Sequence, residues 1–178
     1  MPDKFTITTS GDGVSASRHM MITYLNIGTD DVPEWAAMGA KVTESNIEYD
    51  WSMESMTSIL GETYTKAKTA NMTQAFSGSE IVAGDAVMNT LVNLAIVQKD
   101  AQKLVNQDCL IVHTYLQNES GAVFAERYPA SAVLPTTLGG EGGASLVSDI
   151  EATYGGKRAT GTATVDGKTV TFTPDREV

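Results

Sequence analysis

Glycine is concentrated in residues 136–146, TTLGGEGGASL, and glycine-rich loops are one way in which proteins bind phosphate. Such loops cradle phosphate because their backbone N–H groups approach the ligand closely at the start of a helix. This run lacks the G-x-G-x-x-G spacing, and a strand pattern follows it instead of a helix. We therefore predict a tight bend between two strands, with a geometric role, at Gly139, Gly140, Glu141, Gly142 and Gly143.

A second glycine motif, Gly167-Lys168-Thr169, resembles the end of a P-loop. A P-loop requires an upstream glycine at position 162, where this chain has Thr162. Both flanks of the motif read as strands, so it predicts a hairpin turn.

Candidates for metal or nucleophilic chemistry are few. The histidines are His19 and His113, and the single cysteine is Cys109. Cys109 and His113 would share one face of a strand, but two ligands are too few for zinc. No surrounding motif supports a Cys–His nucleophile. The pattern favours a cysteine packed as a small hydrophobe and a partly buried histidine.

Carboxylate pairs for glycoside hydrolysis remain open, because a chain with 22 Asp and Glu offers many of them. With two Trp and no aromatic cluster along the sequence, a carbohydrate cleft is not indicated. We therefore expect no enzyme activity, no bound metal and no cofactor.

Composition narrows the class of protein. The 178 residues suggest one domain, and 42% hydrophobic with 19% charged residues is typical of a globular fold. The start, MPDKFTITTSG, predicts no secretory signal, and no apolar run is long enough to span a membrane. The net charge of −10 disfavours nucleic-acid readers and anionic membranes as partners.

Strand patterns dominate the chain. Residues 44–51 alternate, with Ile47, Tyr49 and Trp51 on one face and acids on the other, as in a half-buried strand. Pro129 and Pro135 limit the segment between them to an edge or a bend. Further strands are expected at residues 20–27, 109–117, 122–128 and 145–154, after a polar N-terminal arm at residues 1–19.

One helix and one hairpin have the strongest signals. Residues 85–98 place an apolar stripe on one side, with Asp85 or Gly84 as N-cap. Residues 161–173 predict a hairpin about Asp166-Gly167, which pairs Ala163 with Val170.

Residues 52–83 lack a helical period and are rich in Ser, Thr, Gly and Met. We expect one or two strands with a long mobile loop or hairpin excursion, of a length that is usually functional or disordered. Its methionines are either core filler or adaptable contacts with another protein.

The second half of the chain resembles the major tail proteins of long-tailed bacteriophages. The helix "NTLVNLAIVQK", a strand–turn–strand unit, "TTLGGEGGASLVSDIEATYGG" and "GTATVDGKTVTFTP" follow one another in the order typical of the siphophage type from phages and prophages of Gram-positive hosts. The segment "DWSMESMTSILGETYTKAKT" is similar to that family's long strand–loop region. The likeness covers residues 40–174, best from residue 84 onward.

The resemblance implies a β-sandwich of mostly antiparallel sheets with one flanking helix, in hexameric rings that stack into a tail tube. It implies a virion protein that assembles in the host cytoplasm into a tube, and double-stranded DNA passes through this tube on ejection. Expected partners are further copies and the tape measure, tail terminator and distal tail proteins. Subunit contacts are expected at Met53, Met56, Leu60, Met72 and the glycine run at 139–143.

The acidic strand face has two interpretations. Glu44, Glu48 and Asp50 line the tube lumen and repel DNA, or they face outward and keep the subunit soluble. We favour the lumen.

Two other classes of protein compete with the tail tube: a secreted β-sandwich binding module and a small hydrolase. The expected lack of a signal and of an aromatic platform opposes the first, and the lack of a nucleophile–base motif opposes the second.

Overall fold

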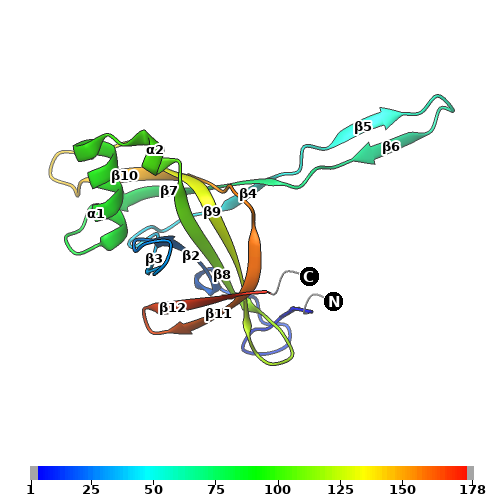
Figure 1. Ribbon diagram of the computed structural model, residues 1–178, viewed down its shortest axis with the longest axis horizontal. Coiled ribbons are helices and arrows are strands. Elements are labelled where there is room, and N and C mark those ends of the chain that lie inside the picture. The colour runs from blue at the N-terminus through cyan, green and yellow to red at the C-terminus, as the bar shows by residue number, and fades with distance from the viewer. Residues whose placement is uncertain (1–3, 176–178) are drawn as a thin grey trace.

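The computed structural model describes residues 4–175 and is mainly β, with antiparallel strands and one helical region (Figure 1). The predicted arm and domain also include residues 1–3 and 176–178, which lie outside the described residues. The strands are β1 (Thr6–Ile7), β2 (Met21–Asn26), β3 (Trp35–Ala37), β4 (Ile47–Asp50), β5 (Glu54–Thr57), β6 (Thr63–Lys66), β7 (Asn71–Glu80), β8 (Gln107–Gln117), β9 (Val123–Pro135), β10 (Val147–Thr153), β11 (Ala159–Asp166) and β12 (Thr169–Pro174). The helices are η1 (Arg18–Met20), α1 (Ala86–Val92), the π-helical η2 (Asn93–Gln98) and α2 (Ala101–Leu104).

Strand β9 joins the two halves of the sheet. Its first half pairs with β8 and β11, and its second half pairs with β10. The strand order is β3-β2-β8-β9-β10-β7-β4, with β11 and β12 continuing from β9 and β1 added to the end of β8. Pro129 lies between the β11-paired and the β10-paired parts of β9. Within the segment that Pro129 and Pro135 bracket, Ser131 pairs with Gln107 of β8 and residues 132–135 pair with β10 alone, which fits the expected edge position.

The main core lies between the two halves of the sheet and under the helices. Leu25 and Ile111 come from one half, Phe76 and Ile150 from the other, and Leu91 from α1. A second cluster forms on the other face of β2 and β8, where β11 and β12 contribute Ala163 and Val170. The expected β-rich fold with one flanking helical region is therefore confirmed.

The helix begins and ends as expected, from the cap at Asp85 to Gln98. The Asp85 carboxylate accepts a hydrogen bond from the Met88 N–H at 3.0 Å, which caps α1. The helix continues through η2 to Gln98, and Lys99 ends it in the left-handed region at φ +53°. A short second helix, α2, follows at once. None of the helices within residues 4–175 is long and apolar enough to cross a bilayer.

The C-terminal hairpin has the expected faces but a different register. Val165 pairs with Val170 and Ala163 with Phe172, so the two-residue loop is Gly167-Lys168 rather than Asp166-Gly167. Gly167 has φ +59°, which suits the first central position of a type II′ turn. Only glycine adopts this φ freely, and it therefore fixes the register one residue later than the Asp-Gly pattern predicts.

The excursion in residues 52–83 is shorter than expected. Strand β7 belongs to the main sheet and alternates buried and exposed side chains. Gln74 is one of its inward residues, with its amide nitrogen 2.9 Å from Ser45 Oγ and its oxygen accepting from Thr23 at 2.8 Å and from the Tyr154 hydroxyl. A polar residue in an inward position weakened the sequence pattern. Within residues 52–83, β5 and β6 leave the body of the molecule as a separate two-stranded hairpin (Figure 1).

Candidate functional site

The β5–β6 hairpin is the most prominent feature of the molecule and projects along its long axis (Figure 1). Hydroxyl pairs cross the ladder, Ser55 with Thr65 and Thr57 with Thr63, each at 3.4 Å. At the tip, the Ser58 N–H donates to the Glu62 carbonyl at 2.8 Å. The side chains of β5 and β6 are all exposed, so the hairpin buries almost nothing within its own chain.

Large apolar side chains gather on this hairpin. Ile59 at the tip is 104% exposed, Leu60 is 82% exposed and Met53 is 72% exposed. Met56 and Tyr64 follow at 42% and 43%. An exposed apolar group of this kind on a protruding element marks an interaction surface. The hairpin thus presents three of the residues expected at subunit contacts: Met53, Met56 and Leu60.

Met72, the fourth such residue, has a different position. It is 8% exposed and lies in the main core, where its Sδ is 3.0 Å from the Tyr128 hydroxyl. The expectation of a subunit contact is not supported for Met72, because packing within the chain already accounts for its side chain.

The glycine run links β9 to β10, as expected, at the end of the molecule opposite the hairpin (Figure 1). Gly139 forms a bridge with Val147. A Cβ on Gly140 would lie 2.6 Å from the Ser145 carbonyl oxygen, and Gly143 has φ +84°. The turn therefore requires glycine at these two positions. Residues 139–143 are at the surface except for the partly buried Gly139, and their contact with another subunit stays a prediction.

The outer face of β4, β7 and β10 forms an acidic groove. Glu48 pairs across the sheet with Thr73, and Ala75 pairs with Glu151. A shallow groove of about 380 Å³ on this face is lined by Glu44, Glu48 and Glu151, together with hydroxyl and small side chains but no Lys or Arg. Two of the three expected acids therefore lie together.

Asp50, the third expected acid, is exposed at the end of β4 and does not line the groove. Its carboxylate accepts a hydrogen bond from the Ser52 N–H at 2.9 Å, at the point where the chain leaves the sheet toward the hairpin. Glu151, exposed on β10, completes the acidic groove instead.

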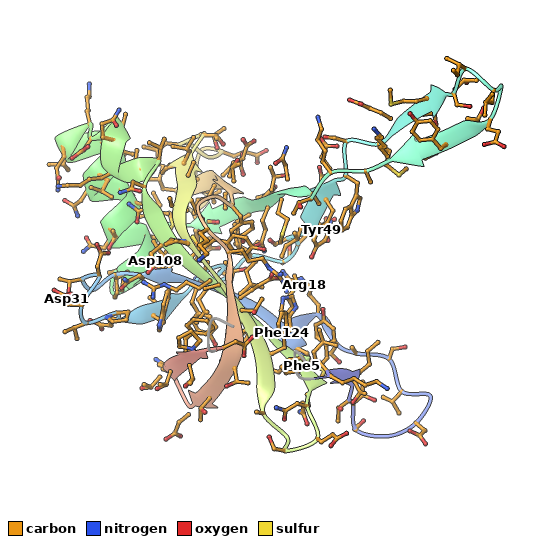
Figure 2. All side chains as sticks on the ribbon, turned by 45° about the vertical axis from the view of Figure 1, so that its right-hand side comes forward. Phe5, Arg18, Asp31, Tyr49, Asp108 and Phe124 are labelled. Atoms are coloured by element: carbon orange, nitrogen blue, oxygen red, sulfur yellow. The ribbon has the colours of Figure 1, made fainter. Side chains whose placement is uncertain are left out.

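The opposite side of β4 borders an aromatic pocket of about 700 Å³. Tyr49 and Trp51 stack with ring centroids 6.1 Å apart at the base of the hairpin. His113 stacks on Phe124 at 5.6 Å, and Phe5 of the N-terminal segment packs on the same ring at 5.0 Å. Figure 2 shows Tyr49 near the hairpin base and Phe5 beside Phe124. The sequence-based expectation that the chain has no aromatic cluster is therefore wrong.

Glu126 anchors the floor of this pocket. Its carboxylate is 5% exposed and accepts from His113 Nε2 at 3.0 Å, the Tyr128 hydroxyl at 2.9 Å and Arg158 Nε at 2.7 Å. Burial by itself would raise the pKa of Glu126, but hydrogen bonds from His113 and Arg158 outweigh burial and hold it below the usual value. The pKa of Tyr128 is raised, first by burial and then by the neighbouring Glu126 charge.

Cys109 and His113, the pair considered and rejected from the sequence, do not come together. Cys109 is fully buried in the main core, and burial raises its pKa to about 12, which keeps the thiol protonated. His113 faces Glu126 rather than Cys109. Within residues 4–175, no group of three or more His, Cys, Asp or Glu side chains is arranged to hold a metal ion.

No family model and no curated protein matches the sequence. Among solved structures, the chain is similar to the tube terminating cap of the anti-feeding prophage, with 16% identity, 88% of this chain and 97% of that chain covered, and a TM-score of 0.44. It is also similar to a chain of the PVC sheath-tube complex of an extracellular contractile injection system, with 11% identity, coverage of 85% and 94%, and a TM-score of 0.46. A third likeness is to the PVC sheath/tube terminator, with 11% identity, coverage of 84% and 99%, and a TM-score of 0.47. No residue role follows from likeness at this level.

Proposed function

We propose that this chain is a structural subunit of a phage tail tube, in which hexameric rings of the chain stack and genomic DNA passes through the centre. The β5–β6 hairpin carries the proposal. It buries almost nothing in its own chain, and its tip presents Ile59 and Leu60 to solvent. The apolar side chains of such an element can be buried only against another molecule, and in this proposal that molecule is a copy in the next ring. The siphophage-like sequence order supports the same assignment.

Open sheet edges support lateral association within a ring. Among the described residues, β3, β4 and β12 each pair with only one neighbour. An unpaired edge has free N–H and C=O groups that another chain can pair with, and closure into a ring removes such edges. Lateral pairing through edges and axial contact through the hairpin would together build a tube.

The acidic groove suits the inner wall of such a tube. Glu44, Glu48 and Glu151 lie on one sheet face with small and hydroxyl neighbours and no cation. Phosphate groups would not bind to this surface, so a duplex could slide along it. Asp50 contributes charge only at the margin of this face.

The proposed role is structural and not catalytic. The subunit would assemble in the host cytoplasm, become part of the virion tail, and meet the tape measure, terminator and distal tail proteins at the ends of the tube. A β-sandwich binding module is the second candidate, and the aromatic pocket at Tyr49, Trp51 and Phe124 is the observation that favours it.

Electron microscopy of concentrated purified protein tests the proposal, with a hairpin deletion as the comparison. Removal of residues 53–67 joins Ser52 to Lys68, and this closure is short because the Lys68 N–H already donates to the Trp51 carbonyl at 3.1 Å. We expect rings or tubes from the intact chain. The deletion variant should melt like the intact chain but form no stacked tubes. A strict monomer at all concentrations that binds a ligand would favour the binding module.

A further inference from the structure

The tip of the hairpin cannot reach any apolar surface of its own chain. Leu60 at the tip lies nine positions after Trp51 at the base, and an extended strand of nine steps spans about 30 Å. The ladder runs straight outward from the body (Figure 1). Whatever covers Ile59 and Leu60 must therefore come from another molecule.

We propose that the aromatic pocket of one copy receives the tip of the β5–β6 hairpin of a second copy, with Ile59 and Leu60 against the rings and Glu62 at Arg158. This inference rests on the proposed function and names the receiving surface, which that function leaves open. The pocket has a volume of about 700 Å³ and many of its lining side chains are aromatic, so it has room for two aliphatic side chains from a tight turn.

Charge complementarity favours this pocket over the apolar groove beside α1. Arg158 is half exposed at the pocket, and its Nε donates to Glu126 at 2.7 Å. A guanidinium has further N–H donors, which a second carboxylate can accept. Glu62 follows the tip directly and is exposed. The groove beside α1, of about 710 Å³, is lined by Asp85 and no Lys or Arg, so it would repel Glu62.

The positions of tip and pocket also determine the form of the assembly. Tyr49 and Trp51 place the pocket at the base of the same hairpin whose tip is about 30 Å away. Tip and pocket are different surfaces, so the contact is head-to-tail and leaves a free tip and a free pocket at the two ends. Its repetition extends a stack along the hairpin direction.

Disulfide trapping between two single-cysteine variants tests the contact. Leu60→Cys provides the tip and Thr69→Cys the rim of the pocket, with the Tyr49–Trp51 stack left intact. The native Cys109 is fully buried and stays protonated, so it does not compete. Mixed and mildly oxidised under assembly conditions, the two variants should give a disulfide-linked heterodimer. Thr164→Cys, exposed on β11, serves as the matched control and should give none.

Charge neutralisation gives a second readout. Glu62→Gln should raise the critical concentration for assembly about two- to fivefold and reduce its salt dependence. Glu54→Gln removes the same charge from the stem of the hairpin and should change neither quantity.

The outcomes separate the inference from the proposed function. Tubes without the Leu60–Thr69 disulfide, or with a disulfide from Leu60→Cys to Val82→Cys in the α1 groove, would overturn the inference and leave the tube in place. An intact chain that never assembles would overturn both.

Discussion

The double substitution Ile59→Ser and Leu60→Ser separates assembly from folding. In the free subunit the two side chains are 104% and 82% exposed, so their removal costs little buried surface. Surface changes of this kind alter the free energy of unfolding by about 0.5 kcal/mol or less. We therefore expect an unchanged thermal melt for the monomer.

Assembly should respond strongly to the same change. Full burial of an Ile or Leu side chain is worth about 1.5–3 kcal/mol, so two of them contribute about 3–6 kcal/mol to each contact. Since about 1.4 kcal/mol is a factor of ten, the critical concentration should rise by about 10²- to 10⁴-fold. Partial burial in the assembly would place the result near the lower end.

Sedimentation, which separates assembled from free protein, measures the critical concentration over a concentration series, and circular dichroism measures the melting temperature. Val32→Ser, which removes a side chain 73% exposed and distant in sequence from the hairpin, is the control and should change neither. An unchanged critical concentration in the double variant would refute the idea that the tip is buried on assembly. A melting temperature lowered by several degrees would show instead that the tip stabilises its own subunit.

Three further predictions concern folding, pH and DNA passage. Gly167→Val should destabilise the subunit by about 1–3 kcal/mol, because a β-branched residue does not accept φ +59°; an unchanged melting curve would contradict the turn. The pKa of Glu126 is lower in the folded state, so its contribution to stability is present above its unfolded pKa and is lost as pH falls through the folded pKa. The melting temperature should therefore fall in acid, and it should fall less in Glu126→Gln. Thermal melts of both proteins from pH 7 to pH 3 measure the difference. Replacement of the groove acids Glu44, Glu48 and Glu151 with Lys should leave tubes that assemble but release DNA slowly at low salt and faster at high salt. Normal ejection kinetics at both salt concentrations would place these residues away from the DNA.

Local patterns predicted most of the β architecture. Alternation in residues 145–154 predicts one face made of Leu146, Ile150, Ala152 and Tyr154. The last three are buried, but Leu146 is 51% exposed, because it precedes the register shift between Ser148 and Ile150 in β10. The Asp85 cap and the apolar stripe after it predicted α1 correctly. These features depend on residues close in sequence, where spacing alone determines which side chains share a face.

Features that depend on distant residues were missed. The pattern of β7 was obscured by Gln74, whose polar partners come from three other segments. The aromatic pocket combines β4 with β8, β9 and residues 154–158, which only the folded sheet brings together. Alternation groups Asp50 with Glu48. In the structure Asp50 is the last residue of β4, and its carboxylate accepts a hydrogen bond from the Ser52 N–H, so it does not line the groove.

The hairpin gives the free subunit two levels of stability. An isolated two-stranded ribbon is marginally stable in water, whereas β8 is central and carries fully buried side chains. Amide hydrogens in β5 and β6 should therefore exchange with solvent rapidly by local fraying, while those in β8 exchange only on global unfolding. A protease added to free subunits should cut first near the tip and leave the body intact. The entropy cost of ordering the hairpin is then incurred on assembly, which weakens each single contact. Growth is therefore favoured from a preformed ring that binds several hairpins at once.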